Sequence, residues 1–150
     1  MTGRIALRDE EETRALGSAL SDAVEEGLAI CLFGELGAGK TTLCQGFIAA
    51  RTGIAFAQSP TFTLLQAYPG ELYHLDLYRL ERTDLQEFGI EEIFAPDAVL
   101  LIEWPERAEG ALPDDRLEVR LRREGDERAA EVLARGPRAK RAQERLRWPQ

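Results

Sequence analysis

Cysteine and histidine are scarce in this chain of 150 residues, and that scarcity excludes two common ways of cross-linking a fold. The two cysteines, Cys31 and Cys44, are too few for a disulfide framework. Each lies in an apolar run, so we expect buried thiols in a reducing compartment. The single histidine, His74, has no zinc-ligand spacing to either cysteine, so we expect no zinc site. A hydrogen-bonded structural role is favoured for His74 over a catalytic one.

Long apolar runs are also missing, which excludes a membrane-spanning helix, because such a helix needs about 18 or more consecutive apolar residues. The first residues turn acidic at once and contain no apolar core segment, so they do not resemble a signal peptide. With 44% hydrophobic and 31% charged residues, the composition is typical of one soluble globular domain. We therefore expect a cytoplasmic protein that does not bind membranes.

Positive charge is in deficit, since the net charge is -8, and this argues against nucleic-acid binding by the body of the protein. The deficit is uneven, because residues 136–150 carry five basic side chains against Glu144 alone. That segment has a net charge of +4, which leaves -12 for the rest. We predict a domain over residues 1–135 and a flexible basic tail over 136–150. Such a tail could reach RNA or an acidic partner.

Apolar periodicity alternates between strand and helix patterns along the chain. Continuous apolar runs at 28–33 and 98–104 predict strands buried on both faces, and 3–7 predicts a short strand. Helical spacing covers residues 9–26, 39–51 and 82–94. Residues 61–80 predict a hairpin around a Pro-Gly turn, and 116–122 alternate as a half-exposed strand that returns through 129–134. Together these elements predict an α/β domain whose mixed sheet is parallel at its centre, antiparallel toward its edges and flanked by helices.

The segment LFGELGAGKTT, residues 32–42, fits the P-loop pattern G-x-x-x-x-G-K-[ST] between a predicted strand and a predicted helix. Glycines let successive backbone N–H groups turn toward an anion, and the helix N-terminus adds partial positive charge. Lys40, the only lysine before the tail, would reach the β- and γ-phosphates, and the Thr41 hydroxyl would bind Mg²⁺. We therefore predict a P-loop NTPase fold that binds ATP and Mg²⁺. The nucleotide-binding residues expected in this segment are Gly34, Gly37, Ala38, Gly39, Lys40, Thr41 and Thr42.

Two carboxylates are candidates for work beside the metal. Glu103 ends a buried strand, the Walker B pattern, where a carboxylate is costly unless it meets a cation or water. Asp76 could hold the metal's water shell or position an attacking water. We therefore expect Lys40, Asp76 and Glu103 to be catalytic, with Thr41 and Glu103 at the metal.

Other residues near these motifs leave alternatives open. Ser59 and Thr61 could sense the γ-phosphate as a switch, or their segment could simply form a turn. Trp104 directly follows Glu103, and it could stack beside the nucleotide or fill core.

Five segments together resemble one family. GELGAGKTT, SPTFTL, YHLDLYRL, GIEE and LIEWPER stand in the order and spacing of the TsaE family, also called YjeE/YdiB, and the resemblance runs from about residue 5 to 134. It implies a small P-loop ATPase that supports formation of threonylcarbamoyladenosine at position 37 of tRNAs. In that family the protein binds a TsaD–TsaB complex, which transfers the group to tRNA, so contact with tRNA is indirect.

The resemblance also implies roles for particular residues. It matches the phosphate and metal residues to Lys40 and Thr41, the functional acids to Asp76 and Glu103, and the nucleotide-side tryptophan to Trp104. It places Glu10 near the base and Arg128 near the nucleotide.

The residues alone leave other functions open. A small-molecule P-loop kinase is the main alternative, although the 105–115 loop is short for an arginine-bearing lid and contains only Arg107. A nucleotide-gated binding module with negligible turnover is another. Phosphate release, measured against phosphate transfer to an added acceptor, separates these hypotheses.

Overall fold

Seven strands form a single mixed sheet in the computed structural model, which describes residues 3–55, 57–58, 65–79 and 94–148. The strand order across the sheet is β1-β7-β6-β2-β5-β4-β3. Strands β6, β2, β5 and β4 run parallel, whereas the β1–β7, β7–β6 and β4–β3 pairs are antiparallel. The predicted fold class, parallel at the centre and antiparallel at the edges, is confirmed. The strands are β1 (Ile5–Leu7), β2 (Leu28–Phe33), β3 (Leu65–Tyr68), β4 (Leu72–Asp76), β5 (Val99–Glu103), β6 (Arg116–Glu124) and β7 (Glu127–Arg135).

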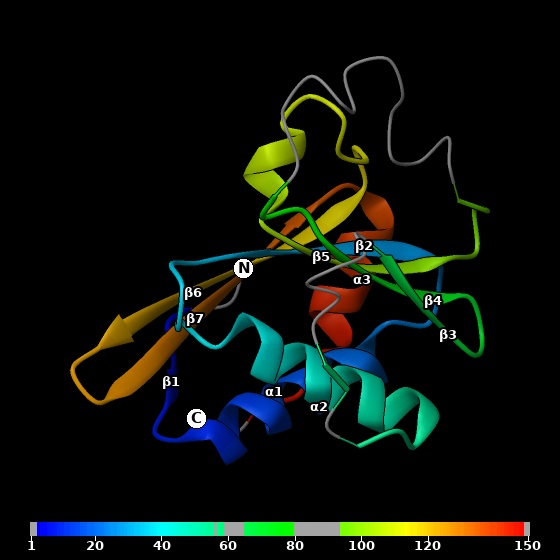
Figure 1. Cartoon of the computed structure of the whole chain (residues 1–150). Coiled ribbons are helices and arrows are strands. Elements are labelled where there is room, and N and C mark those ends of the chain that lie inside the picture. The colour runs from blue at the N-terminus through cyan, green and yellow to red at the C-terminus, as the bar shows by residue number, and fades with distance from the viewer. Residues whose placement is uncertain (1–2, 56, 59–64, 80–93, 149–150) are drawn as a thin grey trace.

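Helices cover one face of this sheet (Figure 1). They are α1 (Glu10–Ala23), α2 (Lys40–Thr52) and α3 (Pro137–Arg145). Their apolar residues join those of one sheet face in the larger core, which includes Leu16, Phe47 and Val119. On the other face, a smaller core around Cys31 and Ile102 lies under the 3-10 helix η3 (Pro105–Ala108) and the loop after it. Both cysteines are free and buried, as predicted.

Two glycines allow α1 and α2 to pack unusually close together. A Cβ added at Gly17 would lie 2.1 Å from the Leu43 carbonyl oxygen, and one at Gly46 would lie 2.0 Å from that of Arg14. Asp9 caps α1, because its carboxylate accepts a hydrogen bond from the Glu12 N–H at 2.9 Å. This packing holds the beginning of α1 beside the beginning of α2.

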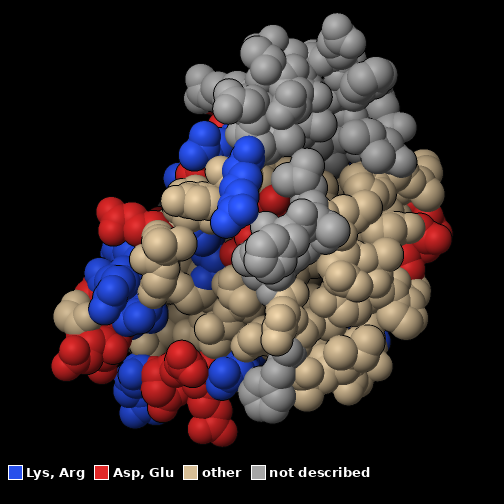
Figure 2. Space-filling view, viewed as in Figure 1, with Lys and Arg blue, Asp and Glu red and all other residues tan. Residues whose placement is uncertain are grey.

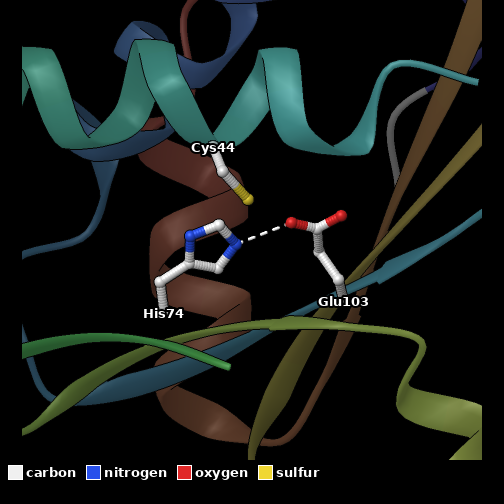
Figure 3. Close-up of side chains that lie close together, drawn as sticks. All are labelled: Cys44, His74 and Glu103. Carbon is white, nitrogen blue, oxygen red and sulfur yellow. Dashed lines mark hydrogen bonds and ion pairs between the residues drawn. The ribbon is translucent and has the colours of Figure 1, made fainter. Parts of the chain in front are cut away.

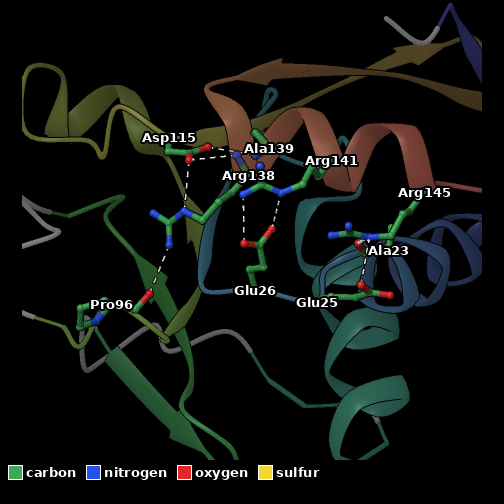
Figure 4. Close-up of polar contacts among 9 residues, drawn as sticks. All are labelled: Ala23, Glu25, Glu26, Pro96, Asp115, Arg138, Ala139, Arg141 and Arg145. Carbon is green, nitrogen blue, oxygen red and sulfur yellow. Dashed lines mark hydrogen bonds and ion pairs between the residues drawn. The ribbon is translucent and has the colours of Figure 1, made fainter.

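The chain after residue 135 corrects the prediction of a flexible tail. Residues 137–145 form α3, whose Ala139 and Ala142 are fully buried against the larger core. The Asp115 carboxylate accepts hydrogen bonds from the backbone N–H groups of Arg138 and Ala139, at 3.1 and 3.0 Å (Figure 4). The net charge of this segment wrongly indicated a solvated tail, because arginines of α3 form ion pairs with acidic residues elsewhere in the fold.

Those arginines bind to groups far away in the sequence. Arg141 makes two hydrogen bonds to the Glu26 carboxylate, at 2.8 and 3.0 Å. Arg145 donates to the Ala23 carbonyl oxygen at 2.8 Å, so the end of α1 is tied to α3 (Figure 4).

The remaining predictions of local structure are mostly confirmed. Within the hairpin predicted over 61–80, the described residues 65–79 form β3 and β4 around the Pro69-Gly70 turn. Residues 105–115, predicted as a loop, contain the short helix η3. The helix predicted over 82–94 lies almost entirely outside the described residues. None of the described helices is both long and apolar enough to cross a membrane.

Candidate functional site

A cleft of about 900 Å³ opens at the carboxyl ends of the parallel strands β2, β4 and β5. This is where ligands bind in open α/β sheets. The beginning of α1, the glycine loop and the turn of the β6–β7 hairpin complete its walls. Figure 2 shows acidic and basic side chains mixed on the side toward which that hairpin projects, whereas the opposite side is mainly uncharged. Most of the predicted site residues line this cleft, namely Glu10, Gly37, Gly39, Lys40, Thr41, Thr42, Asp76, Glu103, Trp104 and Arg128.

The glycine loop, residues 34–39, has a backbone that other residues would strain. Gly37 and Gly39 have φ angles of 82° and 108°, in the left-handed region. A Cβ on Gly34 would lie 2.7 Å from the Leu121 carbonyl oxygen, so the loop fits closely under the end of β6. Gly39 is also the N-cap of α2 and offers no side-chain cap, which leaves the first N–H groups of the helix for another acceptor. The loop can therefore present backbone donors to an anion.

Lys40 lies at the centre of the site and is only 5% exposed. Its ammonium group donates a hydrogen bond to the Gly34 carbonyl oxygen and lies 3.4 Å from the centre of the Trp104 ring. Burial lowers the pKa of Lys40, and the carboxylates of Glu103, Glu106 and Asp76 oppose this shift. A partly desolvated cation of this kind favours a nearby anion.

Glu103 is 2% exposed and receives hydrogen bonds from two directions. The Thr41 hydroxyl donates to its Oε1 atom at 3.1 Å, and the His74 Nε2 atom lies 2.6 Å from its Oε2 atom (Figure 3). Asp76 is paired with Glu103 in the register of β4 and β5, so both acids lie at the same edge of the sheet. His74 is therefore hydrogen-bonded, as predicted, and its partner is one of the predicted catalytic acids.

The oxygen atoms of this site suit a magnesium ion. Mg²⁺ prefers carboxylate and hydroxyl oxygens, and the Thr41 and Glu103 oxygens already lie 3.1 Å apart beside the glycine loop. Asp76 adds a second carboxylate at the same sheet edge. The residues present therefore fit the metal that the P-loop motif implies.

The fold brings together three possible zinc ligands that are far apart in the sequence. Candidate ligand atoms of Cys44, His74 and Glu103 all lie within 4.8 Å of one another (Figure 3). However, His74 and Glu103 are bonded to each other, and burial raises the pKa of Cys44 well above its usual value. A thiol rather than a metal-binding thiolate is thereby favoured at Cys44.

Trp104 has an unusual backbone for a bulky residue, with a φ angle of 57°. Its ring packs against Tyr78, with ring centres 4.9 Å apart, and faces the Lys40 ammonium. Of the two alternatives, core or nucleotide side, the structure places it in the wall of the cleft while it also packs against the smaller core. Tyr78 also lines the cleft, and sequence analysis gave it no role.

The β6–β7 hairpin brings arginines to the glycine loop. Arg128 donates a hydrogen bond from Nε to the Gly37 carbonyl oxygen at 3.1 Å, across 91 residues of sequence. Arg8 and Arg79, which sequence analysis did not select, line the cleft as well, together with the 73% exposed Leu36. Arg79 and Leu36 lie within quoted motifs, whereas Arg8 lies in none and is brought to the site by the fold alone.

Four predicted residues are placed differently from the rest or are not described. Ala38 is fully buried, so only its backbone can serve the site. Gly34 does not line the cleft, although its carbonyl oxygen holds Lys40. Ser59 and Thr61 lie outside the described residues, so their switch role stays a prediction.

Known proteins resemble this chain in sequence and in fold. The family model described as threonylcarbamoyl adenosine biosynthesis protein TsaE matches residues 7–131. The chain is 37% identical over 120 residues to the tRNA threonylcarbamoyladenosine biosynthesis protein TsaE of Bacillus subtilis, covering 78% of this chain and 75% of that protein. The protein of the same name in Haemophilus influenzae is 40% identical over 114 residues, covering 73% and 72%.

A solved structure agrees with these matches. The crystal structure of YdiB of Bacillus subtilis has a TM-score of 0.79 and 32% identity to this chain, covering 97% of it and 95% of YdiB. This likeness confirms the predicted P-loop NTPase fold. The chain therefore belongs to the TsaE family, whose members take part in tRNA threonylcarbamoyladenosine biosynthesis.

Proposed function

We propose that this protein binds and hydrolyses ATP as an accessory protein of tRNA threonylcarbamoyladenosine biosynthesis, acting in the cytoplasm on a TsaD–TsaB complex. The observation that carries the ATPase proposal is the meeting of the glycine loop, Lys40, Thr41 and Glu103 in one cleft. The pathway follows from the family. The partners rest on the resemblance in the sequence, and tRNA is reached only through the complex.

In this proposal the triphosphate enters between the glycine loop and Trp104. The N–H groups at the beginning of α2 donate to phosphate oxygens, and the Lys40 ammonium moves from the Gly34 carbonyl oxygen to the β- and γ-phosphates. Trp104 loses its cation and becomes one side of the nucleotide site. Lys40 thereby exchanges two uncharged partners, the Gly34 carbonyl oxygen and the Trp104 ring, for anionic phosphate oxygens, which favours binding.

Catalysis then depends on positioning and charge. Thr41 and Glu103 would hold Mg²⁺, which offsets the negative charge on the phosphate oxygens. Asp76 accepts a hydrogen bond from the attacking water and orients its oxygen toward the γ-phosphorus. Lys40 stabilises the charge on the phosphoryl group during transfer.

The outer part of the cleft suits the base and ribose. The first residue of α1, Glu10, offers a carboxylate there, and Arg128 offers a guanidinium beside the Gly37 carbonyl oxygen. Leu36 supplies exposed apolar surface on the same side. These contacts would hold the nucleoside while the glycine loop holds the phosphates.

The decisive experiment measures phosphate release by the purified protein alone, and then with TsaD, TsaB and tRNA. We expect slow hydrolysis alone, a faster rate with the complex, and loss of both in Lys40→Ala and Glu103→Ala. Lys140→Ala is a matched control, because it removes the only other lysine, which lies on α3 away from the cleft. Transfer of phosphate to a small acceptor would instead support a kinase, and tight ATP binding without turnover would support a nucleotide-gated binding module.

A further inference from the structure

A buried hydrogen bond lies behind the proposed metal residues and has no part in the steps described above. His74 and Glu103 are 1% and 2% exposed, and their side chains meet from the neighbouring strands β4 and β5 (Figure 3). The distance from Nε2 of His74 to Oε2 of Glu103 is 2.6 Å, which is short for an N–H···O hydrogen bond to a carboxylate.

The partners of the carboxylate decide where the proton lies. An ionised carboxylate only accepts hydrogen bonds, so we assign the proton to Nε2 of His74. Nδ1 of the same ring is buried and has no hydrogen-bond partner among the described residues. An unpaired buried nitrogen costs free energy, and an apolar side chain would avoid this cost. The hydrogen bond from Nε2 to Glu103 is therefore the one interaction by which an imidazole serves this position better than an apolar side chain would.

Two side chains hold the Glu103 carboxylate from different elements. His74 binds Oε2 from within the core, and the Thr41 hydroxyl, at the beginning of α2, lies 3.1 Å from Oε1 and 3.3 Å from Oε2. We infer that His74 is a positioning residue, which keeps the Glu103 carboxylate turned toward Thr41 and so ready to bind Mg²⁺. This inference rests on the proposed function, because it deepens the role of Glu103 in that site.

Cys44 provides the matched control in this pocket. It is fully buried and adjoins the pair, yet among the described residues no hydrogen bond joins its thiol to His74 or Glu103. Replacing it tests whether any disturbance of the pocket alters the metal site. It also tests whether the thiol is itself a ligand.

Calorimetry of ADP binding, with and without Mg²⁺, measures the inferred role without requiring turnover. In His74→Leu we expect the increase in ADP affinity that Mg²⁺ produces to fall by about tenfold or more, as when other supports of metal ligands are removed. Affinity without Mg²⁺ should stay unchanged. His74→Gln should recover most of the increase, because its amide nitrogen can donate from a similar position, and Cys44→Ala should match the wild type.

Combining variants makes the test specific to Glu103. In a Glu103→Ala background, His74→Leu should cause no further loss of the Mg²⁺ effect. The inference would be overturned if His74→Leu kept the full Mg²⁺ effect, or weakened ADP binding equally with and without the metal. A loss in Cys44→Ala as large as in His74→Leu would overturn it as well, and would point to a thiol-containing metal site.

Proton NMR gives a readout that needs no nucleotide and remains useful if His74→Leu does not fold. The Nε2–H proton of His74 should appear far downfield and exchange slowly in the wild-type protein, and it should shift in Glu103→Asp. Its absence would overturn the inference. If the wild type shows no hydrolysis under any condition while the Mg²⁺ effect still depends on His74, the proposed ATPase fails and the positioning role stands.

Discussion

Replacing Gly46 with alanine should test how the site is supported, because this residue lies where α2 touches α1. The new Cβ would lie 2.0 Å from the Arg14 carbonyl oxygen and 2.7 Å from two further backbone atoms of Arg14. Ordinary contact begins near 3.4 Å, so the helices must separate by about 1.4 Å at this point. No side-chain rotation can relieve the clash, because every nearby atom belongs to the backbone.

Two effects of the substitution compete. Alanine is a better helix former than glycine by about 1 kcal/mol. Overpacking a close interface costs about 1–3 kcal/mol or more, and here it also loosens the packing of Leu16, Leu20 and Phe47 in the core. Since the displaced atoms are backbone, we place the clash at the upper end of that range. The net effect should be a loss of about 2 kcal/mol in the free energy of unfolding.

Urea unfolding of Gly46→Ala and the wild type measures this difference directly. Gly3→Ala is the control, because a Cβ at Gly3 meets nothing within 4 Å. ADP affinity should fall together with stability, since α1 and α2 begin with Glu10 and Lys40, which both line the cleft. An unchanged or higher unfolding midpoint in Gly46→Ala would refute the close approach of the two helices.

Three further outcomes follow from single contacts. Burial alone would raise the pKa of Glu118, but hydrogen bonds from three arginines lower this pKa below its ordinary value of 4.5. The ionised carboxylate therefore stabilises the fold above pH 4.5, and this stability should be lost as the pH falls through the lowered pKa. Melting temperatures measured against pH should accordingly depend less on acid in Glu118→Gln than in the wild type. Tryptophan fluorescence, recorded in a Trp148→Phe background, should change when ATP draws Lys40 away from Trp104, and Lys40→Ala should lack this change. Asp115→Ala should lower the free energy of unfolding by about 1–2 kcal/mol, because the first N–H groups of α3 lose their acceptor, and chemical denaturation can measure this loss.

Local patterns predicted the parts of the fold that depend on neighbouring residues. The apolar run of β2 and the glycine loop after it lie where expected, and Glu103 ends β5 as its motif indicated. The Pro69-Gly70 turn likewise predicted the hairpin of β3 and β4. In each case the residues that determine the structure lie within a short segment, so the sequence of that segment was sufficient to predict it.

Contacts between distant segments could not be predicted in this way. The bond between His74 and Glu103 joins two strands whose register depends on the whole sheet, and Arg128 reaches Gly37 only because the β6–β7 hairpin leans toward the glycine loop. The basic C-terminal segment gave a misleading signal for a related reason. Its charges predict a solvated tail when they are summed, yet Arg141 binds Glu26, a residue 115 positions earlier.

The same distinction explains how the site is built. The motif residues supply groups that can touch phosphate or metal, but their orientation depends on contacts that the fold makes between separate motifs and with residues outside them. Glu103 is held by His74 from the core, Lys40 is held by Gly34 and Trp104, and the helix that carries Thr41 is seated against α1 through Gly46. Because Lys40 occupies its site through a carbonyl oxygen and a ring face, both uncharged, an entering phosphate can replace them at small cost. The Glu103 carboxylate, in contrast, is already held in place by hydrogen bonds before a ligand binds. Nucleotide binding should therefore move the Lys40 ammonium and leave the Glu103 carboxylate where it is.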